Sequence, residues 1–155
     1  MYVHKKNQAF SLIEVLVFIS VFAVFFVVAI AAVTASLRNM KINEHKIIAT
    51  RYAEELQEWL KSEKEIDWNI FSTSRIGTYC FNNPIPISSW PAAGACGVND
   101  FSGISGINPA IFKREMILTV TGNPVTQVDA VITVSWKEVN QTFNVTLNSV
   151  FNPWE

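Results

Sequence analysis

The sequence predicts an α+β protein in which a long N-terminal helix packs against a C-terminal antiparallel sheet. Three observations support this fold class. An uncharged apolar run extends from Val15 to Leu37, and a helical repeat of apolar residues follows it to about Lys61. The last third of the chain then alternates apolar and polar residues with the period of a strand. With 155 residues, the chain has room for one globular domain besides the membrane-length part of the helix.

The composition favours no nucleic-acid partner. Lysine and arginine together number 12, aspartate and glutamate number 13, and the formal net charge is -1. No basic cluster is interleaved with aromatic residues, as a nucleic-acid groove would require. Hydrophobic residues make up 50% of the chain, and they are concentrated in its N-terminal third. The remainder has the composition of an ordinary soluble domain.

The apolar run is a predicted membrane segment. Its length of about 23 residues is enough to cross a hydrocarbon layer about 30 Å thick. A secretory signal peptide is the competing interpretation, because residues 29–31 imitate its cleavage site, but the run is longer than the apolar core of a signal peptide. Lysines precede the run, and Arg38 and Lys41 follow it, so the positive-inside rule does not by itself decide the orientation.

Glu14 lies at the entrance to this apolar run. An unpaired carboxylate in hydrocarbon would cost several kcal/mol, so we expect Glu14 to have a cationic partner. The preceding residues, 1–9, form a short basic leader. Removal of that leader between Ala9 and Phe10 would create a new amine four residues before Glu14. A simpler interpretation is that a carboxylate suits the positive end of a helix dipole, although this does not explain the leader.

The leader, the small residue Ala9 and the following Phe-Ser-Leu-Ile-Glu-Val-Leu-Val resemble the N-terminus of type IV pilins and pseudopilins. The resemblance implies cleavage after Ala9 by a prepilin peptidase and N-methylation of Phe10. It also implies that Glu14 forms an assembly salt bridge with the methylated amine of a neighbouring subunit. The family most often has glycine before the cut, so Ala9 departs from the usual pattern.

The same resemblance implies a location and a set of partners. Residues 1–9 would be the leader, residues 10–37 the transmembrane and assembly helix, and residues 38–155 an extracytoplasmic head. The chain would cross the inner, cytoplasmic membrane once and later enter a pilus or pseudopilus. The expected partners are other pilin or pseudopilin subunits, the prepilin peptidase and methyltransferase, membrane lipid before assembly, and the inner-membrane assembly platform. No cofactor is expected.

A helical pattern continues beyond the membrane segment. Neither proline nor glycine occurs from Phe10 to Lys61, and a continuous helix of about 52 residues would be about 78 Å long. This length exceeds a bilayer, so the second half must pack outside it. Its apolar stripe is predicted to face the core of the head and consists of Ile48, Tyr52, Leu56, Trp59 and Leu60. Ser62 and the stretch 67–69 mark the expected end of the helix.

Residues 72–112 form a predicted loop-rich region, with one short strand at 77–81. Cys80 and Cys96 are the only cysteines in the chain. In an exported domain such a pair favours a disulfide, which would stabilise the fold by about 3 kcal/mol in the chain-entropy model. Two unpaired thiols are the alternative. A metal site is disfavoured, because the spacing is not that of a zinc motif and His45 lies far away in sequence.

Residues 113–150 are predicted to form an antiparallel sheet, with strands at 116–121, 128–139 and 143–147 and a tight connection near Asn140. One face of this sheet is apolar and is expected to be covered by the helix. The Val-x-Trp and Phe-x-Val-x-Leu patterns of the last two strands also resemble the C-terminal hairpin of V-type minor pilins and of minor pseudopilins of type II secretion.

No combination of residues predicts catalysis, since the chain has no Gly-rich phosphate loop and no His-Glu-x-x-His motif. His45 is expected to be a solvated side chain on a charged part of the helix. Asp100 could contribute to a calcium site, but a single acid with neighbouring amides is weak support. Two carboxylate pairs are expected to be solvated: Glu54 with Glu55, and Glu63 with Glu65.

These patterns favour a non-enzymatic minor pilin that assembles into, or primes, a type IV pilus through its N-terminal helix. The alternative within the same class is a minor pseudopilin of a type II secretion system. An alternative of a different class is a membrane-tethered binding or adhesin-like module, for which the helix is only an anchor.

Overall fold

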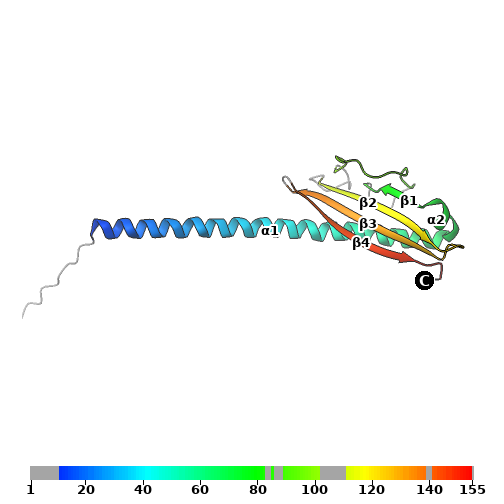
Figure 1. Ribbon diagram of the computed structural model, residues 1–155, viewed down its shortest axis with the longest axis horizontal. Helices are drawn as coiled ribbons and strands as arrows, with labels where there is room; N and C mark the ends of the chain where they lie inside the picture. Colours follow the sequence, from blue (N-terminus) through cyan, green and yellow to red (C-terminus); the bar gives the residue numbers. More distant parts are fainter. Residues whose placement is uncertain (1–10, 83–84, 86–88, 102–110, 139–140, 155) are drawn as a thin grey trace, which may run out of the picture. The chain divides into compact units, whose positions relative to one another are not determined.

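The computed structural model describes residues 11–82, 85, 89–101, 111–138 and 141–154 (Figure 1). The elements along the chain are α1 (Leu12–Ile66), α2 (Trp68–Ser74), β1 (Gly77–Cys80), β2 (Phe112–Thr121), β3 (Gln127–Glu138) and β4 (Gln141–Phe151). The chain divides into two compact units, Met1–Lys41 and Ile42–Glu155. The first contains the apolar part of α1, and the second contains the rest of α1 and all the other elements. The predicted α+β class is confirmed.

Helix α1 is 55 residues long and ends at Ile66, five residues beyond the expected end at Lys61. Asp67 follows in an extended conformation and caps α2, since its Oδ1 accepts a hydrogen bond of 3.0 Å from the backbone N–H of Ile70. Helix α2 was not predicted. Its residues, Trp-Asn-Ile-Phe-Ser-Thr-Ser, have weak intrinsic helix preference, and the capping aspartate was the only local signal for it.

The four strands form one antiparallel sheet in the order β1-β2-β3-β4. The predicted strands are confirmed, and the short strand expected at 77–81 is β1. Strand β2 begins at Phe112, four residues before the predicted start at Met116. Three consecutive charged residues, 113–115, hid this part of the strand from the sequence pattern. Residues 139–140, where the tight connection was expected, lie outside the described residues.

The core of the second unit lies between the C-terminal part of α1 and the inner face of the sheet, which Figure 1 shows lying along that part of the helix. Tyr52, Leu56, Trp59 and Leu60 of the predicted stripe are buried, and Ile48 packs at the edge of the core. Burial of each large apolar side chain stabilises the fold by about 1.5–3 kcal/mol. The sheet contributes these buried apolar residues: Tyr79, Phe112, Met116, Leu118, Val128, Ala130, Ile132, Val134, Trp136 and Phe151.

Candidate functional site

The N-terminal unit is an apolar helical segment whose side chains are exposed. The large apolar side chains from Leu12 to Leu37 have exposed fractions between 46% at Val15 and 78% at Leu12. Helix α1 is long enough and apolar enough, by length and composition, to cross a membrane. An exposed apolar surface of this extent needs lipid or other helices to cover it.

Two uncharged polar side chains of this segment, Ser20 and Thr34, form hydrogen bonds within the helix. The Ser20 hydroxyl donates to the carbonyl of Val17 at 2.8 Å, and the Thr34 hydroxyl lies 3.0 Å from the carbonyl of Ile30. A polar group whose hydrogen bond is made inside its own helix can enter a dry environment at little cost. Glu14 differs from these residues because its side chain is charged, and this charge still needs a partner in a dry environment.

Glu14 lies in the first turn of α1, where its backbone N–H donates to the carbonyl of Ser11 at 3.0 Å. No residue that the structure describes forms an ion pair or a hydrogen bond with its carboxylate. Ala9 and Phe10 lie outside the described residues, so the cleavage site and the pairing of Glu14 with the Phe10 amine stay predictions.

Residues 4–34 match the family model described as the prokaryotic N-terminal methylation motif. The chain carries a prokaryotic N-terminal methylation motif. The match supports the type IV pilin and pseudopilin family, and it includes the predicted cleavage site and the apolar helix as far as Thr34. The V-type minor subtype stays a prediction. Neither the curated proteins nor the solved structures contain a match to this chain.

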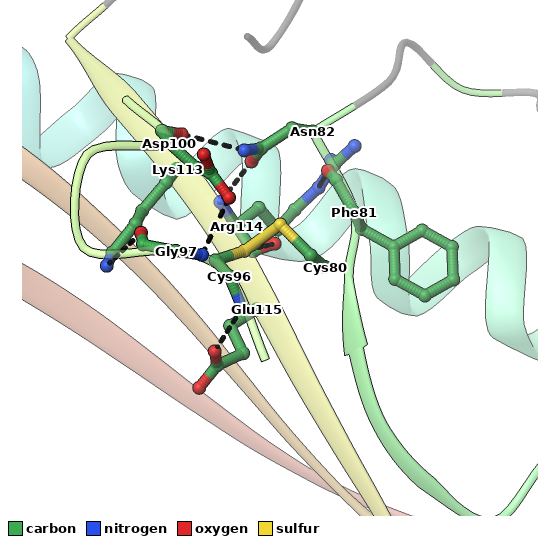
Figure 2. The surroundings of a disulfide bond; sticks show 9 residues. All are labelled: Cys80, Phe81, Asn82, Cys96, Gly97, Asp100, Lys113, Arg114 and Glu115. Carbon is green, nitrogen blue, oxygen red and sulfur yellow. Dashed lines mark hydrogen bonds between the residues drawn. A yellow bond between two sulfur atoms is a disulfide. The ribbon is translucent and has the colours of Figure 1, made fainter. Parts of the chain in front are cut away.

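The head contains a disulfide between Cys80, the last residue of β1, and Cys96 (Figure 2). Their Cα atoms are 4.7 Å apart. The expected pairing is therefore present in the structure. The backbone N–H of Cys96 also donates to Oε2 of Glu115 at 2.8 Å. The segment around Cys96 is therefore joined to β1 by a covalent bond and to β2 by a hydrogen bond.

Arg114 of β2 is fully buried, with an exposed fraction of 0%, and lies close to the disulfide (Figure 2). Its Nε donates to the carbonyl of Phe81 at 3.1 Å, and its Nη1 donates to the carbonyl of Tyr52 at 2.8 Å. Nη1 is also 3.3 Å from Oε2 of Glu55. Burial lowers the pKa of Arg114, while the charge of Glu55 opposes that shift. One guanidinium thus joins α1, β2 and the segment after β1.

The structural role of Arg114 was not predicted from the sequence. Arg114 is the middle one of three consecutive charged residues, a pattern typical of a solvent-exposed segment. The signal that could have identified it is the alternation of the strand, because Arg114 has the same parity as the core residues Phe112, Met116 and Leu118. A charged residue at such a position must be buried with partners.

Trp90 packs in an aromatic cluster of the head. Its ring centroid is 5.0 Å from that of Trp59 and 5.7 Å from that of Phe81, and its Nε1 donates to Oε2 of Glu63 at 2.7 Å. The guanidinium of Arg75 lies 4.9 Å from its centroid. The expectation that Glu63 is a solvated carboxylate is therefore wrong, because Glu63 is the hydrogen-bond acceptor for this cluster.

His45 is buried, and the expectation of a solvated side chain is wrong. Its Nδ1 contacts Oε1 of Glu138, and its ring meets that of Phe112 edge-on, with centroids 5.7 Å apart. His45 precedes Ala49 by four residues and Tyr52 by seven, so it lies on the core-facing stripe of α1. The charged residues on either side of His45 in the sequence obscured its place in the apolar pattern.

Asp100 stabilises its own loop. Its Oδ2 accepts a hydrogen bond of 2.6 Å from the backbone N–H of Gly97, and its carbonyl accepts one of 2.7 Å from Nδ2 of Asn82 (Figure 2). The described part of the chain contains no group of three or more metal-ligating side chains. The geometry therefore gives Asp100 a structural role in the disulfide region of the head.

Proposed function

We propose that this chain is a non-enzymatic minor pilin that assembles into, or primes, a type IV pilus through its N-terminal helix. The observation that carries the proposal is Glu14. It is the only charged residue between Leu12 and Leu37, and its carboxylate has no partner among the described residues. The methylation motif at residues 4–34 supports the same interpretation.

Assembly needs a polar interaction to set the register of the subunits. When apolar helices leave lipid and pack on one another, their side chains exchange one apolar environment for another, so the hydrophobic effect contributes little. A carboxylate and an ammonium group attract strongly in such low-dielectric surroundings, and loss of one leaves the other unpaired. We assign this interaction to Glu14 and the methylated amine of Phe10 on a neighbouring subunit.

The head and the membrane segment have separate parts in this proposal. The chain is held in the inner membrane by residues 10–37, with the head outside the cytoplasm, until the assembly platform adds it to a filament. An extracytoplasmic head is consistent with the Cys80–Cys96 disulfide, because disulfides persist in oxidising compartments.

The test compares the incorporation of Glu14→Ala with that of wild type into sheared filaments. We expect Glu14→Ala to insert in the membrane at the wild-type level but to be depleted from the filaments. Glu44→Ala is the matched control, because Glu44 is an exposed carboxylate on the same helix beyond the apolar run. Equal incorporation of the wild type and Glu14→Ala would contradict the proposal.

Two further measurements separate the alternatives. In a strain without prepilin peptidase, a processed pilin or pseudopilin would keep its leader, whereas a simple membrane-tethered module would have the same mature length as in the wild-type strain. A deletion strain that loses surface filaments but keeps protein secretion supports a pilin, and the opposite result supports a pseudopilin of a type II secretion system.

A further inference from the structure

Basic residues follow the apolar run of α1 directly. Arg38, Lys41 and Lys46 are the first three lysine or arginine residues after Leu37, and Glu44 is the one acidic residue among them. From residue 47 to residue 67 the balance is reversed, with three basic and six acidic residues. The charge of the helix therefore changes sign along its length. We call residues 38–46 the basic segment.

The cationic side chains of the basic segment face outward. Arg38, Lys41 and Lys46 are all exposed. No described residue forms an ion pair with Lys41 or Lys46. This holds even for Glu44, which lies three residues after Lys41, a spacing at which an ion pair can form on one helix face. The charges of these two lysines are therefore available to a partner outside the chain.

The spacing along α1 places these residues at the depth of lipid headgroups. The helical rise puts the Cα atom of Arg38 about 1.5 Å, and that of Lys41 about 6 Å, beyond Leu37 along the helix. The headgroup layer on each side of a bilayer is about 5–7 Å thick, so both residues lie within it when the apolar run spans the hydrocarbon. Lys46 is five residues further along α1, about 7 Å past Lys41. This distance is within one Debye length, about 8 Å at physiological ionic strength.

The proposed orientation puts the basic segment on the unusual side of the membrane. Residues 10–13 contain no lysine or arginine, so once the leader is removed the basic residues nearest the membrane lie on the side of the head. The positive-inside rule places most such residues on the cytoplasmic side, whereas the proposed function places the head outside the cytoplasm. An anionic partner at the outer surface of the membrane explains this placement.

We propose that the basic segment binds the headgroups of anionic phospholipids in the extracytoplasmic leaflet of the inner membrane. The inference rests on the proposed function, because that function holds the chain in this membrane before assembly. Arginine and lysine both donate charge-assisted hydrogen bonds to phosphate oxygens, and each such residue near an anionic membrane surface raises the affinity about fivefold. A zwitterionic phospholipid has the same phosphate, but its own cationic group offsets the attraction. The basic segment should therefore distinguish anionic from zwitterionic phospholipids.

The acidic residues of a second copy are the competing partner, but they lie at the wrong height in a membrane. Glu54 is the first acidic residue after Glu44, and it lies about 20 Å beyond Lys41 along the helix. Two copies held at the same depth in one membrane have their basic segments at the same height, where like charges repel. Before assembly, lipid is therefore the anionic partner within reach of the basic segment.

The test measures the dissociation constants of phosphatidylglycerol and phosphatidylcholine with identical acyl chains, by native mass spectrometry of the full-length protein in detergent. We expect the wild type to prefer phosphatidylglycerol about tenfold, and Lys41→Gln with Lys46→Gln to reduce this preference about fivefold. The matched control is Arg51→Gln with Lys61→Gln, which removes the same charge from exposed positions of α1 farther from the apolar run and should keep the wild-type preference. Tryptophan fluorescence checks that both variants are folded. No preference in the wild type, or an equal loss in the two variants, would overturn the proposal.

The same measurement separates this inference from the proposed function. Glu14→Ala should keep the wild-type preference for phosphatidylglycerol, because Glu14 acts in assembly and not in headgroup binding. If Glu14→Ala is depleted from filaments while the wild type shows no lipid preference, the lipid inference alone is wrong. If Glu14→Ala enters filaments normally while the preference is present, the proposed function alone is wrong. A wild-type dimer that Lys41→Gln with Lys46→Gln abolishes, with no effect on lipid binding, would identify a second copy as the partner and overturn the lipid inference.

Discussion

Replacement of Arg114 by methionine tests how the head is held together. The guanidinium donates to the carbonyls of Phe81 and Tyr52 and contacts Glu55. The Tyr52 carbonyl lies inside α1 and keeps its helical hydrogen bond, whereas the Phe81 carbonyl loses a charged donor. A hydrogen bond to a charged group contributes about 1.5–3 kcal/mol, and a buried unsatisfied group costs about 1–3 kcal/mol. Removal of the buried charge offsets part of this loss, so we expect Arg114→Met to cost about 2–3 kcal/mol.

The assay is urea unfolding of the full-length protein in detergent, followed by tryptophan fluorescence, because Trp59, Trp90 and Trp136 all lie in the head. Lys61→Met is the matched control. Lys61 pairs with Glu58 on the surface at 2.7 Å, and exposed pairs contribute about 0–1 kcal/mol. If Arg114→Met is no less stable than Lys61→Met, the reasoning that Arg114 anchors the head is refuted.

Two further stability predictions concern the same part of the head. Cys80→Ser combined with Cys96→Ser should lower the free energy of unfolding by about 3 kcal/mol, and a reductant should destabilise the wild type but not this variant; a reductant-sensitive variant would contradict the prediction. Burial, aided by the charge of Glu55, raises the pKa of Tyr52 above its ordinary value of 10.0. The unfolded chain therefore loses this phenolic proton first, so stability should fall as pH rises through 10, and urea unfolding should show a shallower fall for Tyr52→Phe; identical pH slopes would contradict it.

The long elements could be predicted because their patterns are regular over many residues. The stripe from Ile48 to Leu60 has a helical period, and β3 and β4 alternate with the period of a strand. The prediction of the disulfide required little more than an even pair of cysteines in a domain that was expected to be exported. The methylation motif at residues 4–34 could be recognised because a carboxylate at the entrance to a long apolar run is an uncommon pattern.

The polar anchors of the head could not be predicted because they depend on contacts between residues far apart in sequence. Arg114 and Glu63 belong to local charge runs, yet their partners lie 33 and 27 positions away, in Phe81 and Trp90. The charged neighbours of His45 in the sequence suggest a solvent-exposed side chain. Its position on the helix, four residues before Ala49, instead places it on the face that packs against the core. In each case tertiary packing outweighed the local pattern.

The most direct test of the account is the intact mass of the protein purified from cell membranes, combined with sequencing of its N-terminus. We predict a chain that begins at Phe10 and carries one additional methyl group on its terminal amine. A chain that still begins at Met1 would leave Glu14 without its proposed partner, and a chain that begins near Ala32, within the apolar segment, would lack Glu14 itself. Either result would contradict the assignment as a pilin.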